Sequence, residues 1–453
     1  MAGMESEQGT ARVSPTGSSA ELTGRRPARP GGGGADRRGE LDLLRGLVVL
    51  GLVFFHSAVI FGAGELPIKR APENVVAVLF VAFGATWGMP LLFVVAGMGV
   101  FYSLRSRDAG QFVRERVGRL LVPLVFGVLT LVPLQVYLGL RYSHEAAGGY
   151  ARFYRRWLDV RPSPDFPFLV RPAGHGPFQT GHLWFLACLL GYSLLLSPLF
   201  LLARRRHAAR LLDRASALST RPGLLFLPAL PLAMIEVAAG SDEGMAGWNR
   251  YSYAVLLGYG YLAAADPRID ATMRRRWRPA LALAAGLFAA GLGAYAAADA
   301  GGAAPFVDHD PASLTFRLLK TVDGWLWIVA IIGGASGIAH HRAGPDQGTS
   351  SRPRQPRWQR LAGYTNQAVL PFYILHETVI VAVAYVVLSW PIPGAAQYTL
   401  IVAVSLAGTL LVYDLAVRRT PITRWLFGLR PHPPPLSTPT DDPALHHAEG
   451  DTP

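Results

Sequence analysis

The sequence predicts an all-α integral membrane protein with about ten transmembrane helices, and three observations support this fold class. Hydrophobic residues make up 51% of the chain and charged residues only 16%, whereas average soluble proteins carry about 25% charged residues. Apolar segments long enough to cross a bilayer recur along most of the chain. Arginine-rich stretches separate them, as expected of loops that face an anionic membrane surface.

Each terminus is predicted to be a disordered tail. Residues 1–39 are rich in Gly, Ser, Pro and Arg and show no apolar period, which is typical of segments that cannot form a core. They lack the cleavage-site pattern of a secretory signal, so we expect the first span to remain as an anchor. Residues 431–453 are expected to form a Pro-rich tail, and residues 40–430 the membrane domain.

Ten apolar segments mark the expected spans, since about 20 mostly apolar residues are needed to cross a bilayer. The sixth segment is short and rich in tyrosine, and the eighth carries Asp323. The segments begin near Leu43, Val75, Leu120, Leu183, Gly223, Trp248, Pro279, Arg317, Thr365 and Tyr398.

The distribution of arginine between these spans predicts their orientation. Four connections on one side of the membrane carry five, six, five and five arginines: residues 103–119, 204–221, 266–278 and 340–364. Connections on the other side carry few, except residues 141–181, which carry six. Because positively charged loops stay in the cytoplasm, both termini are predicted to be cytoplasmic.

Composition also excludes several classes of protein. The single cysteine, Cys188, leaves no internal disulfide framework and no multi-cysteine metal site, and we interpret it as a small apolar residue. No phosphate-binding loop, dinucleotide fingerprint, paired-histidine zinc motif or serine-hydrolase spacing is present, so no metal is expected. The net charge of +13 is spread between apolar segments, which argues against a nucleic-acid partner.

Ionisable residues within spans are costly and point to function, and the first span carries two. Arg45 lies at its cytoplasmic end and His56 follows eleven residues later. On a helix this spacing puts both side chains on nearly the same face, roughly 16 Å apart along the axis. An imidazole at that depth can act as a base near neutral pH. Equally, His56 could be a hydrogen-bonded structural residue and Arg45 a topological anchor.

Two further histidines are candidates for a polar cavity. His376 and Glu377 are expected near the middle of the ninth span, at a depth similar to that of His56. Their alternative role is a structural network that links helices. His182 marks the external end of the fourth span, where it would face either an external substrate or lipid headgroups; the neighbouring Trp184 is explained by an interfacial aromatic belt.

Charged residues near the ends of spans could either bind a ligand or have a purely structural role. Arg116 and Arg119 precede the third span and could hold phosphates of a cytosolic ligand through bidentate hydrogen bonds. From the residues alone, a role as topology signals is favoured. Glu236 and Asp323 are both expected near external helix ends.

Taken in order, six motifs resemble the membrane-bound acyltransferase family 3. The first is an arginine and a histidine separated by ten residues in the first span, and the second departs from the family pattern because Ala96 replaces serine. Together they run from Leu41 to Gly428. The last motif, together with the segment His182–Leu186, resembles the branch of glucan-modifying succinyltransferases. The motifs are Asp42–Gly46 with His56, Pro90–Gly97, Phe112–Pro123, Gly181–Leu186, Tyr373–His376, and Tyr413–Asp414 with Arg418–Arg419 and Phe427–Gly428.

This resemblance implies a stand-alone acyltransferase of the cell membrane. Its co-substrate would be cytosolic acyl-CoA, with no bound cofactor, and its acceptor a hydroxyl of a glycan or small molecule destined for export. The acyl group would be acetyl, succinyl or similar. Arg45 and His56 would be the essential pair, Arg116 and Arg119 would contact donor phosphates, and His182 and His376 would line the cavity.

A secondary transporter of a small polar or sugar-like solute is the alternative function. It would also bury histidine and arginine and show alternating loop charge. Discontinuous helices and repeated halves are typical of such transporters, and the sequence shows no repeat of that kind. The acyltransferase is therefore favoured.

Overall fold

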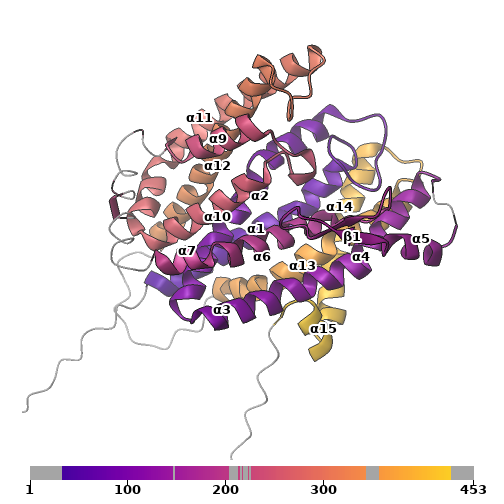
Figure 1. Ribbon diagram of the computed structural model, residues 1–453, viewed down its shortest axis with the longest axis horizontal. Coiled ribbons are helices and arrows are strands. Elements are labelled where there is room, and N and C mark those ends of the chain that lie inside the picture. The colour runs from indigo at the N-terminus through magenta and orange to yellow at the C-terminus, as the bar shows by residue number, and fades with distance from the viewer. Residues whose placement is uncertain are drawn as a thin grey trace, which may run out of the picture.

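The computed structural model describes residues 33–145, 148–203, 213–214, 217, 223, 226–342 and 357–429. Most of these residues are helical (Figure 1). Residues 1–32 of the first expected tail and all of the second, 431–453, lie outside the described part, as do residue 430, most of residues 204–221 and all of 343–356. The α-helices are α1 (Gly33–Val59), α2 (Val75–Arg105), α3 (Ala109–Arg116), α4 (Val122–Tyr142), α5 (Tyr150–Trp157), α6 (Trp184–Leu195), α7 (Ser197–Leu202), α9 (Ala229–Ala239), α10 (Arg250–Ala265), α11 (Pro267–Ala300), α12 (Pro311–Arg342), α13 (Arg357–Val387), α14 (Gly394–Val412) and α15 (Pro421–Leu426).

Seven helical stretches among the described residues are long and apolar enough to cross a membrane. This confirms the all-α class and is what a multi-pass membrane protein requires. Three expected spans are shorter: residues 181–195 and 229–239 are apolar but brief, and α10 has 16 residues. The number ten and the orientation of the termini stay predictions. The seven stretches are Asp42–Val59, Val75–Arg105, Ala109–Tyr142, Pro267–Ala300, Pro311–Ile338, Gly363–Val387 and Gly394–Val417.

Local sequence accounts for several helix boundaries. Gly240, at φ +74°, lies directly after α9 and adopts a left-handed conformation that favours glycine. The Asn249 side chain accepts a hydrogen bond from the Tyr251 amide and begins α10. Towards the N-terminus, α1 begins at Gly33, so the helix extends into residues 33–39, which were expected to belong to a disordered tail. That stretch is polar but contains no proline, so it can continue the helix.

Three pairs of helices make the most extensive contacts: α11 with α12, α10 with α2, and α1 with α13. Figure 1 shows α11 and α12 side by side at one edge of the molecule. Between α2 and α10 the backbones approach closely, because a Cβ atom at Gly97 would collide with the carbonyl of Leu257, and one at Gly260 with the carbonyl of Val94. Small residues that permit such approach are typical of membrane helix pairs.

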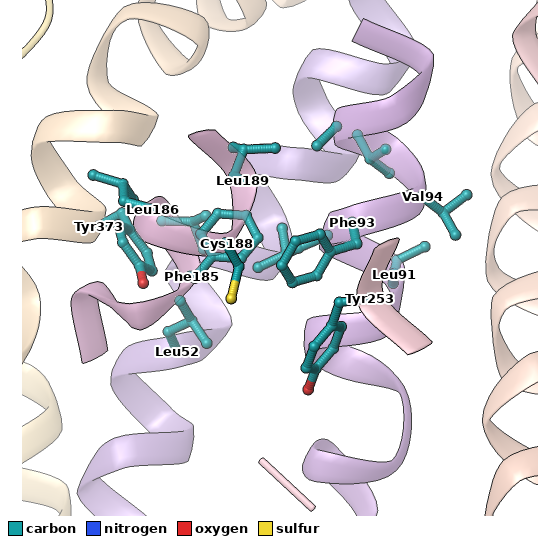
Figure 2. Close-up of a cluster of buried hydrophobic side chains, with 14 of the residues drawn as sticks. Leu52, Leu91, Phe93, Val94, Phe185, Leu186, Cys188, Leu189, Tyr253 and Tyr373 are labelled. Atoms are coloured by element: carbon teal, nitrogen blue, oxygen red, sulfur yellow. The ribbon is translucent and has the colours of Figure 1, made fainter. Parts of the chain in front are cut away.

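Aromatic side chains connect four helices in the centre of the bundle. Phe93 of α2 stacks on Tyr253 of α10 at 4.5 Å and meets the edge of Phe185 of α6 at 4.8 Å between ring centroids. Phe185 in turn contacts Tyr373 of α13 at 5.4 Å. Figure 2 shows Cys188 within this cluster, where it is a buried free thiol. The packing fixes α6, which directly follows the turn that contains His182, against α13, which carries His376 and Glu377.

The long connection between α4 and α6 is folded rather than extended. It contains α5 and a two-stranded antiparallel hairpin, β1 (Val160–Pro162) and β2 (Val170–Pro172), in which Arg161 pairs with Arg171. Trp157 is fully buried, 5.3 Å from the Phe178 ring. This packed element precedes the short 3₁₀ turn η2 (Gly181–Leu183), which leads into α6.

Candidate active site

The turn of α1 that carries His56 lies against α13. The His56 ring packs edge-on against Phe55 and is 5.2 Å from the ring of His376 on α13. Its side chain is 19% exposed, so the ring is sheltered but reachable. The predicted pairing of His56 and His376 at one depth is therefore what the structure contains.

Glu377 of α13 connects His56 to His182. Its Oε2 atom lies 3.5 Å from His56 Nδ1, and its Oε1 atom lies 3.4 Å from His182 Nδ1. The carboxylate is buried, at 5% exposure. A carboxylate facing one imidazole nitrogen orients the ring and leaves the other nitrogen for chemistry.

His182 has an acceptor facing each ring nitrogen. Its Nε2 atom lies 3.2 Å from the carbonyl oxygen of Ile374, and its Nδ1 atom faces Glu377. Tyr373 also donates a hydrogen bond to the His182 carbonyl. His182 is therefore buried within the helix bundle, and the alternative of a residue exposed to headgroups is wrong.

His376 completes the group, with its ring 5.3 Å from that of His182. Its Nδ1 atom lies 2.6 Å from the carbonyl oxygen of Tyr373, so Nδ1 carries the hydrogen in the neutral ring. In the described part of the chain, His376 Nε2 has no hydrogen-bond partner. We call His56, His182, His376 and Glu377 the histidine–glutamate cluster.

Two polar residues that the sequence motifs do not single out lie beside this cluster. Gln135 of α4 and Thr378 of α13 are both buried, and the two side chains are 2.6 Å apart. With the Gln135 amide turned so that its oxygen accepts from Thr378, its nitrogen donates to Glu377 Oε1 at 3.2 Å. Gln135 lies among the apolar residues of the third span, and an uncharged polar residue there was the signal available in the sequence.

Three predicted arginines gather near the start of the apolar stretch Asp42–Val59, whereas His56 lies near its end. Arg45, Arg116 and Arg119 are close enough to repel one another electrostatically. Acidic neighbours offset part of this charge, since Arg45 lies 3.7 Å from Asp42 and Arg119 lies 3.5 Å from Glu115. We call Arg45, Arg116 and Arg119 the arginine group. By helix geometry it begins roughly 16 Å from His56 along α1.

The chain changes helical form where it carries these arginines. After α3, residues 117–121 form the π-helical turn η1, which contains Arg119 and continues into α4. The guanidinium of Arg116 stacks over the Phe112 ring at 5.2 Å. Since π-turns often occur at functional sites, this break in the helix is consistent with a binding role.

Lys69 fixes the chain just beyond His56. Its ammonium group donates to the carbonyls of Val59 (2.7 Å), Gly62 and Gly64 (2.9 Å). Burial lowers the pKa of Lys69, and Glu73, 3.9 Å away, partly offsets that effect. The contacts satisfy carbonyls at and after the end of α1 and hold the turn that carries His56.

A second buried polar group lies between α9, α10 and α12. Glu236 is fully buried and accepts hydrogen bonds from Ser241 (2.5 Å), Ser252 (2.6 Å) and the amide of Asn249 (2.8 Å). Lys320 lies 3.3 Å from it, bonds Ser241 and the Gly247 carbonyl, and stacks over Trp248. We call Glu236, Lys320, Ser241 and Ser252 the lysine–glutamate cluster.

These observations define a multi-pass membrane protein with an internal histidine–glutamate cluster and a separate arginine group. A family model described as an acyltransferase domain matches residues 38–414. The chain thus belongs to the acyltransferase 3 family and is an acyltransferase. No curated protein and no solved structure matches it.

Proposed function

We propose that this acyltransferase moves an acyl group from cytosolic acyl-CoA to a hydroxyl of a carbohydrate or other exported acceptor in the cell membrane. The observation that carries this proposal is the Glu377 carboxylate, which lies within 3.5 Å of both His56 and His182 inside the bundle. A carboxylate that faces two histidines supplies a base inside the helix bundle, as acyl transfer to a hydroxyl requires.

The arginine group suits the donor end. Arg45, Arg116 and Arg119 concentrate positive charge at one end of the bundle, where nucleotide phosphates of acyl-CoA would stay in water. The uncharged arm of the donor would then bridge the roughly 16 Å of α1 that separates Arg45 from His56. Both termini would be cytoplasmic in this arrangement.

His56 is assigned the role of general base. Glu377 faces His56 Nδ1, which leaves Nε2 to take the proton of the acceptor hydroxyl. The hydroxyl oxygen attacks the thioester carbonyl, so a C–O bond forms and the C–S bond breaks. The proton then passes from His56 to the departing thiolate, which restores the neutral base.

The neighbouring histidines suit supporting roles at this centre. His182 and His376 flank the base, and His182 presents a nitrogen to Glu377. An acyl-histidine on His56 is the competing chemistry, and rapid-quench mass spectrometry that finds an acyl adduct on His56 would favour it. The succinyl-transferring branch rests on motif likeness alone; an acetyl or similar donor remains equally compatible with the site.

The test compares cells that express the intact chain with cells that express His56→Ala at matched membrane levels. Mass spectrometry of surface glycans and secreted small molecules should find an acyl mass increment only with the intact chain, and its mass identifies the group. His309→Gln, at an exposed histidine, serves as the matched control and should retain the increment.

Two results would contradict the proposal. If His56→Ala retained the increment, His56 would not be the base. If the intact chain produced no increment and isolated membranes consumed no acyl-CoA, the alternative of solute transport would gain support. Family membership favours the acyltransferase, because a transporter would need no acyl donor.

A further inference from the structure

An apolar groove runs between α11 and α12 on the outside of the bundle. Its volume is about 260 Å³, and Trp277, Leu281, Trp327, Ile331 and Ile338 are among its lining residues. Two of these side chains are open to the surroundings, since Leu281 is 37% exposed and Ile338 60% exposed. The groove therefore faces the membrane and is separate from the histidine–glutamate cluster.

Glycine creates the space for this groove. Gly334 of α12 also lines it, and a Cβ atom added there would lie 3.8 Å from the Trp277 indole. One turn later, Gly337 lies beside the stem of Arg274, at 3.8 Å by the same measure. Larger residues at these two positions would fill the gap opposite Trp277.

Positive charge collects where the groove begins. The guanidinium of Arg278 lies over the Trp277 ring at 5.3 Å, and Arg275 and Arg276 are exposed on the adjoining turn. Nearby carboxylates are already engaged, since Asp270 pairs with Arg274 at 3.2 Å and Asp266 with Arg268 at 2.6 Å. Within the described residues, Arg275, Arg276 and Arg278 have no carboxylate partner.

We propose that this groove is a binding site for an anionic phospholipid. An acyl chain would lie along the apolar walls between Trp277 and Trp327, and the headgroup phosphate would bind Arg275 and Arg278. Tryptophan is typical of the depth where acyl chains meet headgroups, and basic pockets between membrane helices bind acidic lipid headgroups. An apolar groove alone would accept any acyl chain, so Arg275 and Arg278 supply the selectivity for a negatively charged headgroup.

The test is native mass spectrometry of the purified full-length chain in detergent, titrated with equal amounts of phosphatidylglycerol and phosphatidylcholine. We expect phosphatidylglycerol to be retained preferentially by the intact chain. Each arginine near a membrane surface contributes roughly fivefold to such binding, so Arg275→Gln/Arg278→Gln should weaken retention by roughly fivefold to 25-fold. Gly334→Leu, which fills the groove, should weaken it while leaving the arginines in place.

The matched control is Arg155→Gln/Arg156→Gln, an equally exposed pair on α5, which lies far from α11 in Figure 1. It should retain phosphatidylglycerol like the intact chain. Equal retention of the two lipids, an equal loss in the control pair, or unchanged binding in both groove variants would overturn the proposal. A second copy of the chain in place of lipid would overturn it too, and would appear as a dimer without bound phosphatidylglycerol.

Discussion

The two buried polar clusters differ in how completely their atoms are hydrogen-bonded. In the lysine–glutamate cluster, the two Glu236 oxygens receive hydrogen bonds from serine hydroxyls, a backbone amide and Lys320. In the histidine–glutamate cluster, the Nδ1 atoms of His56 and His182 face Glu377 only at 3.5 and 3.4 Å, and His376 Nε2 has no partner among the described residues.

This contrast separates a structural role from a chemical one. Buried charges are tolerated when hydrogen bonds satisfy them, and such pairs resist change. Groups with open hydrogen-bonding capacity cost stability, and they persist where substrates complete the missing contacts. We therefore expect the lysine–glutamate cluster to govern folding and the histidine–glutamate cluster to govern turnover.

The largest effect is expected at His56 and tests whether the histidine–glutamate cluster governs turnover. His56→Gln should lower acyl transfer by about 10²–10⁴-fold, since a general base contributes that much, while thermal stability stays close to that of the intact chain. Acyl-CoA consumption by purified protein and a melting curve measure the two quantities. Full turnover in His56→Gln would remove the distinction between the clusters.

Glu236→Ala tests whether the lysine–glutamate cluster governs folding. Removing one partner of a buried pair leaves Lys320 uncompensated, which should cost about 3–5 kcal/mol of the free energy of unfolding. Activity per folded molecule should remain near that of the intact chain. Glu236→Gln with Lys320→Met, which removes both charges, should recover much of the loss; an unstable double variant with a stable Glu236→Ala would contradict this interpretation.

A smaller effect is expected at the arginine group. Arg116→Gln with Arg119→Gln removes two charge-assisted contacts to phosphates that stay in water, each worth about 1 kcal/mol. The expected result is a KM for acyl-CoA raised tenfold or more, with kcat reduced less. Steady-state kinetics separate the two constants, and Arg155→Gln/Arg156→Gln serves again as the exposed control. A drop in kcat alone would assign these arginines to another step.

The smallest effect is expected at Gln135, whose role is to position Glu377. Gln135→Leu removes one hydrogen bond of about 1 kcal/mol, which corresponds to roughly fivefold in rate. The pH profile of kcat should shift, because the charge of Glu377 would be less well stabilised beside His56. Gln135→Glu should be worse than Gln135→Leu, since it places a second carboxylate against the first; the reverse order would exclude the proposed contact.

Much of the candidate active site could be predicted from the sequence, because ionisable residues are costly within apolar spans and therefore indicate function. His56, His376 and Glu377 were detectable at similar depth, and the structure brings them together. The sequence does not place His182 among the helices, because a residue at the external end of a span can face either an external substrate or lipid headgroups. Its position depends on α13, whose Ile374 carbonyl lies 192 residues further along the chain.

Tertiary pairings explain what the sequence did not predict. Gln135 and Thr378 are separated by 243 residues, and no local pattern links them. Likewise, Glu236 was expected near a helix end, but its partner Lys320 lies on α12, 84 residues away. The shorter α9 and α10 reflect the turn at Gly240 and the cap at Asn249, which hydropathy averages over a window do not detect.

Arg45 and His56 lie on one continuous helix, α1, so the distance and the angle between their side chains depend on the number of residues that separate them. Each residue of an α-helix adds about 1.5 Å along the axis and rotates the chain by about 100°. Inserting or deleting a single residue between the two positions would rotate one out of line with the other. We therefore expect lineages of this enzyme to change the residues around the histidine–glutamate cluster freely while never altering the number of residues between Arg45 and His56.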